Sequence, residues 1–379
     1  IPILNKKNEQ KLNIEKNFID KINLNFLVIS GVYTFNLMFA SLFVIILVLF
    51  KKFSVAGEVG LASSFWLSLT QIFSSNMRSI AIAENDEKIA KDTFIYRFIF
   101  SGILFFTAYF TFNHFISTMK SSLLISLSLL ILFQWIFEMK LVRFEIKNNT
   151  KFFYFIFFIN LLFLLTMILI INVYGIDWSQ FVIYFYIGFL TIFIISDLVS
   201  PKNFISIIST VKKNITTIAF ASSLSIISSS FIWRLLIFTF FERSIAGIFY
   251  ACFSIGSFPG TLFNSVIGPT FVKKKIELNK YLIDFSKLFF VLIAILFIYS
   301  SYQIYVLYNL NSFNFLSTNF FMFVTTISLM GSYFMSFAMF RRHKLIQEGI
   351  SEREGLFLTD IVYGLSITLF VPILYFTGG

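Results

Sequence analysis

Long apolar stretches fill most of this chain, and short polar segments separate them. Each stretch is close to the roughly 20 residues that a helix needs to cross about 30 Å of hydrocarbon. The stretches are continuous, whereas the strands of a membrane barrel alternate between apolar and polar residues. Only helices and closed barrels can cross lipid. The pattern therefore predicts helical spans at 26–50, 57–83, 94–112, 121–138, 152–173, 179–199, 216–241, 246–270, 284–307, 315–339 and 354–376.

Composition supports an integral membrane protein. Hydrophobic residues make up 58% of the 379 residues and charged residues 13%, with a mean hydropathy of +0.84, far outside ordinary soluble usage. A single cysteine, Cys252, excludes an internal disulfide and a thiolate metal cluster. The two histidines, His114 and His343, lie far apart near predicted span ends. No metal or cofactor is therefore expected.

The basic residues are distributed unevenly between the two sides of the predicted bundle. Of 30 Lys and Arg, 25 lie in the N-terminal tail, in the even-numbered connections or at the adjoining span ends. Four lie in the odd-numbered connections, and Arg234 is the remaining one. The positive-inside rule then places the N-terminus, with a segment at 1–25, in the cytoplasm. Since topology explains the net charge of +11, we expect no nucleic-acid partner.

An internal repeat suggests two related halves. Aligning Gly60 with Gly247, an offset of 187 residues, superposes the second span on the eighth and the following basic loops on each other. Such a parallel repeat predicts an all-α polytopic membrane protein with two pseudo-symmetric helical lobes. The lobes would be 26–200, with six helices, and 216–379, with five, joined by a cytoplasmic linker at 201–215. The two readings are a true eleven-span protein and a twelve-span protein of which this chain shows eleven.

Three predicted spans carry small and polar residues at intervals of three, four or, once, seven, which places them along one helix face. Close helix packing explains such faces, because small side chains let backbones approach. Lining of a polar cavity is the alternative, and Gln71 and Asn264 favour it. The residues are Gly60, Ser64, Ser68, Gln71, Ser75 and Arg78 in the second span, Thr216, Ala219, Ser223, Ser230 and Arg234 in the seventh, and Gly247, Tyr250, Ser254, Ser257, Thr261, Asn264 and Gly268 in the eighth.

Arg234 lies well inside the seventh span, where a charge costs about 2.5–3.5 kcal/mol on insertion scales. It is predicted to line a cavity, to pair with Glu58 or Glu242, or to extend outward beside Trp233. Arg78 either extends to lipid phosphates near the cytoplasmic end or serves function. A guanidinium fork matches phosphate oxygens. In a central cavity, Arg234 would therefore hold a phosphate-bearing substrate partway across the membrane.

Proline and glycine interrupt the eighth span. Pro259 frees a backbone carbonyl and, with Gly260 beside it, permits a bend. The pair is a candidate hinge between inward-open and outward-open states. A kink that only serves packing is the alternative.

These features resemble a known family. The segments "AGEVGLA", "ENDEKIAKDTFIYR" and "AGIFYACFSIGSFPGTLFNSVIGPTF" are similar to the polysaccharide-transporter flippases of the multidrug, oligosaccharidyl-lipid and polysaccharide exporter superfamily. The resemblance implies a flippase that moves undecaprenyl-pyrophosphate-linked glycans, such as O-antigen units, across the bacterial inner membrane. Other polysaccharide-assembly proteins would be its partners. Within the expected cavity, the candidate binding residues are Arg234, Arg78, Gln71, Asn264, Ser75, Ser230 and Ser257.

Other classes of protein fit less well. A cation-coupled multidrug exporter needs a buried carboxylate, whereas Glu58, Asp177 and Asp197 lie at span ends and none is predicted in mid-membrane. A membrane-embedded polymerase or glycosyltransferase would be expected to have a long external loop with catalytic groups. A channel would show a filter sequence or a charged ring. The sequence predicts a transporter that is not an enzyme and has no catalytic residue.

Overall fold

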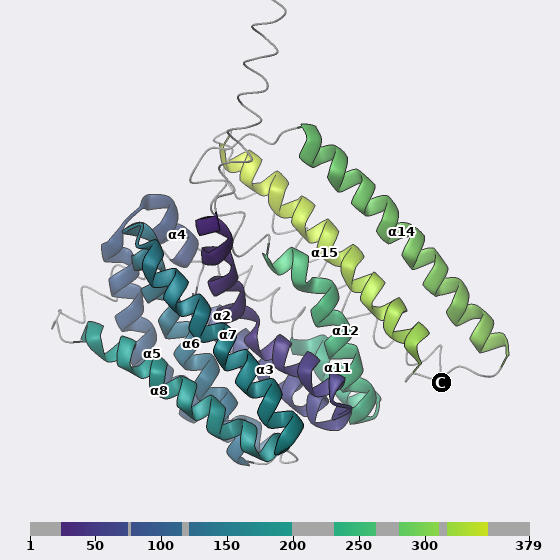
Figure 1. The fold of residues 1–379 in the computed structure, drawn as a ribbon, viewed down its shortest axis with the longest axis horizontal. Coiled ribbons are helices and arrows are strands. Elements are labelled where there is room, and N and C mark those ends of the chain that lie inside the picture. Colours follow the sequence, from purple (N-terminus) through teal and green to yellow (C-terminus); the bar gives the residue numbers. More distant parts are fainter. Residues whose placement is uncertain are drawn as a thin grey trace, which may run out of the picture.

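The computed structural model describes residues 24–74, 77–115, 121–198, 231–262, 280–310 and 317–347, and throughout these ranges the chain is helical with short turns. A described helix overlaps each of the first ten predicted spans; the range 354–376, the tail 1–23 and the linker 201–215 lie outside the described residues. The elements are α2 (Leu24–Leu49), α3 (Phe53–Ser74), α4 (Met77–Glu84), α5 (Glu87–Phe115), α6 (Ser121–Ile146), α7 (Thr150–Val173), η1 (Ile176–Trp178), α8 (Ser179–Leu198), α11 (Trp233–Phe240), α12 (Arg243–Leu262), α14 (Lys280–Asn309) and α15 (Thr318–Gln347) (Figure 1).

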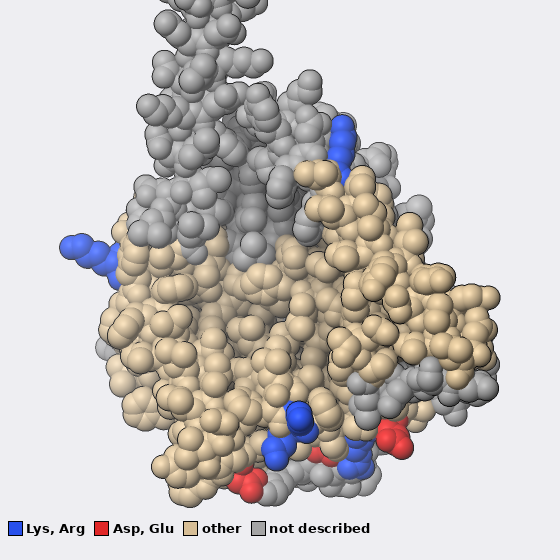
Figure 2. All heavy atoms as spheres, turned by 45° about the vertical axis from the view of Figure 1, so that its right-hand side comes forward, with Lys and Arg blue, Asp and Glu red and all other residues tan. Residues whose placement is uncertain are grey.

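Five of the described segments are long and apolar enough to cross a membrane. They are Val28–Leu49, Ser122–Ile146, Thr150–Val173, Ile176–Ser196 and Phe290–Asn309. The described surface in Figure 2 is almost entirely uncharged, and its few charged side chains lie mostly at the lower edge. A helical protein with such a surface is suited to lipid rather than water.

Helix α7 shows why the surface is apolar. One face is buried and repeats every three or four residues: Phe153, Ile156, Asn160, Phe163, Met167 and Ile171. The opposite face is also apolar but exposed, with Leu161, Leu165 and Leu169 at 46%, 49% and 62% exposure. A helix that is hydrophobic all round belongs either in a core or in a membrane. Because this apolar face is exposed among the described residues, lipid is its expected neighbour.

The bundle is organised around α2 and α6. Helix α2 packs on α3, α6 and α7, while α6 packs on α3, α5 and α8 (Figure 1). Helix α12 joins the later helices to this group, because it packs on α2 and α3 on one side and on α15 on the other. Helix α14 lies at the far edge against α15, and only 11% of its apolar segment is buried, compared with 78% for α6.

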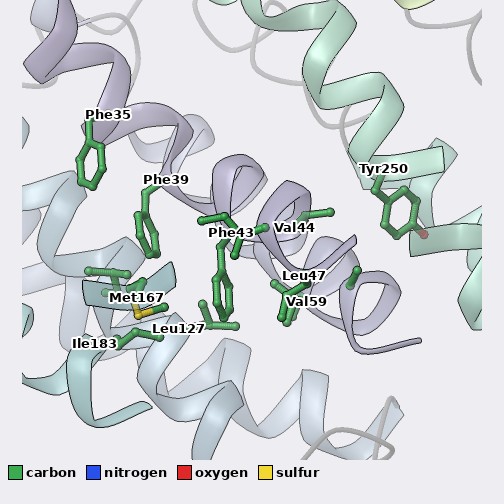
Figure 3. Close-up of a cluster of buried hydrophobic side chains, with 14 of the residues drawn as sticks. Phe35, Phe39, Phe43, Val44, Leu47, Val59, Leu127, Met167, Ile183 and Tyr250 are labelled. Carbon is green, nitrogen blue, oxygen red and sulfur yellow. The ribbon is translucent and has the colours of Figure 1, made fainter. Parts of the chain in front are cut away.

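The core of the first group is aromatic and aliphatic. Phe35, Phe39 and Phe43 project from α2 toward side chains of α6, α7 and α8 (Figure 3). The ring of Phe39 lies 5.1 Å from that of Phe163 and 6.1 Å from that of Phe43, centroid to centroid. Inside a membrane, this close packing replaces the hydrophobic effect as the force that holds helices together.

Three connections between helices use the same turn. Lys51, Asn85 and Asn148 each have a φ between 53° and 59° and follow the last turn of α2, α4 and α6. In each turn, two N–H groups bond back to carbonyls of that last turn, for example Lys52 to Leu47 at 2.8 Å and Lys51 to Val48 at 2.9 Å. This pair of hydrogen bonds is typical of a helix that ends with a residue in the left-handed conformation. The next helix therefore begins almost at once and runs back beside the previous one.

Several predicted span ends lie short of the actual helix ends, and two of them, in α5 and α6, belong to helices that pack on each other. Helix α5 begins at Glu87 rather than 94, and α6 continues to Ile146 rather than 138. The added turns are charged, and their charges are paired with each other. Glu87 Oε1 lies 3.0 Å from Arg143 Nη2 and 2.8 Å from Lys147 Nζ. A charged residue ends an apolar stretch of sequence. The helix itself continues through that residue when the charge is paired with an opposite charge.

These pairs predict a pH-dependent contribution to stability. The Lys147 ammonium, followed by the Arg143 guanidinium, holds the pKa of Glu87 below its ordinary value of 4.5. A carboxyl with a lowered pKa stabilises the folded state above its ordinary pKa, and this contribution is lost as the pH falls through the lowered value. Glu87→Gln should therefore lower the melting temperature at pH 7 but make little difference near pH 3. Thermal melts of both proteins across this range test the prediction, and an equal difference at every pH would contradict it.

Candidate functional site

The Arg234 side chain is buried between α3, α11 and α12. It is 8% exposed, and its Nη1 donates a hydrogen bond to the carbonyl oxygen of Gly60 at 3.2 Å. The guanidinium carbon lies 5.5 Å from the centroid of the Trp233 ring and 5.4 Å from that of Tyr250. Aromatic faces attract a cation, so these two rings stabilise part of the charge without neutralising it.

Among the described residues, Arg234 has no acidic partner within ion-pair distance. Glu58, which the sequence offered as a partner, instead lies 3.0 Å from Arg243, and Glu242 accepts a 3.4 Å hydrogen bond from Ser244. The Nε atom of Arg234 is buried without a hydrogen-bond partner in this part of the chain. A buried cation with an unused donor is the arrangement expected where an anion binds.

Glycines bring the surrounding helices together. A Cβ atom on Gly247 would lie 2.1 Å from the carbonyl oxygen of Phe53, and one on Gly57 would lie 2.3 Å from that of Arg243. A Cβ on Gly60 would lie 2.3 Å from the Tyr250 ring. Helices α3 and α12 therefore cross with their backbones in contact, as small residues permit in membranes. The crossing brings the Gly60 carbonyl within reach of Arg234.

Tyr250 fixes the backbone at this point. Its hydroxyl donates a hydrogen bond to the carbonyl oxygen of Arg234. Its ring meets that of Trp233 edge to face, with centroids 5.7 Å apart. Tyr250 is fully buried and was not among the predicted binding residues. It holds α11 against α12 and thereby sets the direction from which Arg234 enters the site.

The predicted hinge lies in the contact between α12 and α15. Pro259 is inside α12, and the N–H of Gly260 donates a 2.6 Å hydrogen bond to the hydroxyl of Ser332 on α15. Ser332 also donates to the carbonyl of Ser257 at 3.4 Å. A Cβ on Gly260 would lie 2.6 Å from the Ser332 hydroxyl. A bend at this point would have to be shared with α15, and the hinge role stays a prediction.

A second group of charges surrounds Glu138 of α6. The Glu138 Oε2 atom lies 2.7 Å from Arg97 Nη1, and its Oε1 atom lies 3.8 Å from Arg78 Nη1. All three residues are buried, at 7%, 1% and 8% exposure for Glu138, Arg97 and Arg78. The guanidinium of Arg78 lies 3.7 Å from the centroid of the Tyr33 ring. Arg78 is therefore enclosed by protein and paired.

The predicted site residues are not all brought together. Helix α4, which carries Arg78, and helix α11, which carries Arg234, lie apart in the bundle (Figure 1). Ser257 is half-buried on α12 and donates to the carbonyl of Ser254 at 3.3 Å. Ser75, Ser230 and Asn264 lie outside the described residues, as does the side chain of Gln71.

Glu138 was not singled out in the sequence, where it falls at the end of the predicted span 121–138. Because α6 continues for eight residues beyond it to Ile146, Glu138 lies inside a helix and is buried. The segment "QWIFEMKLVRF" could have indicated this, because apolar residues continue on both sides of the glutamate. Arg97 was likewise assigned only to topology, since it follows a basic loop in the sequence.

The fold defines the class of protein: a bundle of helices, several of which are long and apolar enough to cross a membrane. Comparisons with protein-family models, curated proteins and solved structures find no match. A functional assignment must therefore come from the residues and their geometry.

Proposed function

We propose that the protein is a flippase that moves a polyprenyl-pyrophosphate-linked oligosaccharide from the cytoplasmic to the periplasmic leaflet for surface polysaccharide synthesis. Its N-terminus would lie in the cytoplasm and the chain in the inner membrane. Two pseudo-symmetric helical lobes would rock about each other. The resemblance of its loops and of its eighth span to polysaccharide transporters suggests this function.

The observation that carries the proposal is the buried charge of Arg234. No described carboxylate neutralises it, and its Nε donor is unused. A guanidinium presents planar donors that match phosphate oxygens and stays charged at every physiological pH. A pyrophosphate would provide the missing anion. The enclosing Trp233 and Tyr250 rings would exclude water and strengthen the attraction.

The contact between α3 and α12 supports the two-lobe arrangement. These helices are the second and eighth predicted spans, which the offset of 187 residues relates. They cross at Gly57 and Gly247, where a Cβ on Gly247 would lie 2.8 Å from the backbone nitrogen of Gly57. Equivalent helices that meet near an axis between two lobes are typical of transporters built from parallel repeats.

The proposed cycle uses binding and movement only. The lipid-linked sugar enters between the lobes from the cytoplasmic leaflet, and its pyrophosphate engages Arg78 and then Arg234. Hydroxyl and amide side chains, including Ser257 and the predicted Gln71 and Asn264, replace the hydrogen bonds of water along the glycan. Rocking of the lobes, with Pro259 and Gly260 as the candidate hinge, then opens the outer side. No covalent step occurs, so no catalytic residue is needed.

The buried Glu138 does not favour a cation-coupled exporter. Such a transporter needs a carboxylate that can exchange a cation or a proton. Glu138 is already bound by Arg97 at 2.7 Å and faces Arg78 at 3.8 Å. Two nearby positive charges oppose the entry of a third.

Lipid analysis tests the proposed function directly. A polyprenyl-pyrophosphate oligosaccharide should copurify with the wild-type protein from its native host and should be depleted from Arg234→Ala. Arg243→Ala is the matched control. Arg243 lies on the adjacent helix, pairs with Glu58 and has a side chain that is 45% exposed. Mass spectrometry identifies the lipid. If all three preparations lack such a lipid and carry a small cationic compound, the protein is an exporter instead.

A further inference from the structure

The charges around Glu138 do not balance. Arg78 of α4 and Arg97 of α5 face a single carboxylate, and among the described residues no second acidic group lies within ion-pair distance of either. Glu138 shares its two oxygens between them, one each. Within ion-pair distance, two cations therefore face one carboxylate, and all three side chains are at least nine-tenths buried. A second carboxylate, Glu145, lies farther away beside Tyr33 and offsets part of this charge from a distance. Buried cations that lack a direct anionic partner are costly.

The two arginines are satisfied unequally. Arg97 Nη1 donates to Glu138 Oε2 at 2.7 Å and to the carbonyl of Trp135 at 2.6 Å. Arg78 lies 3.8 Å from the same carboxylate, beyond hydrogen-bond distance, and its guanidinium lies over Tyr33. The Nε atoms of both arginines are buried without hydrogen-bond partners in the described chain. Each guanidinium can donate five hydrogen bonds, so the pair has donors that Glu138 does not use.

An ion cluster that served only stability would be expected to have short contacts and no unused hydrogen-bond donors. Buried charges stabilise a fold only when their geometry is good and the remaining donors are bonded. The Arg97–Glu138 bond has good geometry, but the Arg78–Glu138 contact is long and the Nε donors of both arginines are unused. A carboxylate that holds one arginine well and the other poorly is suited to being displaced by an anion with more oxygens.

We propose that Arg78 and Arg97 form a second phosphate-binding site, and that Glu138 is the internal anion which occupies it until a phosphate group takes its place. This inference rests on the proposed function, for which it would supply the first docking point, and it adds Arg97 and Glu138 to the substrate path. The phosphate belongs either to a free or lipid-linked diphosphate or to a phospholipid headgroup. In both cases the incoming oxygens bond the unused donors while the Glu138 carboxylate moves away.

The test measures pyrophosphate binding in a background where Arg234 has been removed. Purified Arg234→Ala protein in phosphatidylcholine nanodiscs is titrated with inorganic pyrophosphate by calorimetry, with and without Glu138→Gln. Removing the competing negative charge should raise the affinity about tenfold. Adding Arg97→Ala should abolish the gain. An unchanged affinity in Glu138→Gln overturns the proposal and leaves the cluster as a structural link between α4, α5 and α6.

Glu87→Gln in the same Arg234→Ala background is the matched control. Glu87 also lies between two cations, Arg143 and Lys147, but its side chain is 39% exposed. Water screens those charges, so pyrophosphate affinity should change less than about twofold. An equal gain in both variants would attribute the effect to net charge and overturn the proposed site.

Two further arms complete the test. In nanodiscs that contain phosphatidylglycerol, loss of the gain assigns the site to lipid headgroups, whereas persistence assigns it to diphosphates. If Glu138→Gln does not fold, Glu138→Asp withdraws the carboxylate by one methylene and should give a gain of about threefold; no gain overturns the proposal. Because every titration lacks Arg234, failure here leaves the lipid test of the proposed function untouched.

Discussion

Arg234→Ala should reduce transport of the lipid-linked glycan by about a hundredfold, since loss of a buried charged hydrogen-bonding group typically costs 2–5 kcal/mol or more. The physical reason is that Arg234 has no described acidic partner to satisfy and an Nε donor left for a ligand. Arg234→Lys keeps the charge but loses the planar fork, so it should retain only part of the activity. Reconstituted vesicles with a fluorescent lipid-linked sugar measure the rate.

Stability distinguishes this role from a structural one. Arg234→Met removes an unneutralised buried cation and keeps much of its apolar volume, so the melting temperature should be unchanged or higher. The lost contributions are one hydrogen bond to Gly60 and two ring contacts. Arg243→Ala, outside the buried site, should transport normally. A variant at Arg234 that melts much earlier yet transports at the wild-type rate would contradict the proposed role.

Gly247→Ala should destabilise the protein and also impair transport. Its new Cβ would lie 2.1 Å from the carbonyl oxygen of Phe53 and 2.8 Å from the nitrogen of Gly57. Because both atoms belong to backbone, α3 and α12 must separate, at a cost of about 1–3 kcal/mol or more. Separation also moves the Gly60 carbonyl away from Arg234. Thermal unfolding followed by the intrinsic fluorescence of tryptophan tests the prediction.

Gly188→Ala is the matched control for this substitution. It also lies within a helix, α8, but a Cβ there would meet nothing within 4 Å. Alanine is favoured over glycine inside helices by about 1 kcal/mol, so this variant should be as stable as the wild type or more so. If both substitutions have the same effect, the backbone contact between α3 and α12 does not limit stability.

Much of the helical framework could be predicted because lipid imposes it. Apolar length located α2 and α7 to within two residues, since their ends coincide with polar connections at Lys51 and Asn149. The same rule failed at the start of α5 and at the end of α6, where Glu87 pairs with Arg143 and with Lys147. Hydropathy treats a charge as an end of a span, whereas a paired charge continues the helix.

The candidate site was only partly predictable. Arg234 stood out because a charge inside an apolar stretch needs a reason. Its actual neighbours, the carbonyl of Gly60 and the ring of Tyr250, depend on how closely α3 and α12 approach, and single-sequence patterns do not contain that distance. Glu138 and Arg97 were missed for the same reason, since residues 41 positions apart meet only after the helices pack.

The glycine crossing of α3 and α12 also has a consequence for movement. Where two backbones touch, as at Gly57 and Gly247, the angle between the helices can change more easily than their separation can. From Gly247 to Leu262 α12 extends about 22 Å at 1.5 Å per residue. A turn of about 10° around the crossing would therefore shift its far end by about 4 Å. The close contact between the two backbones would then act as the pivot of this movement.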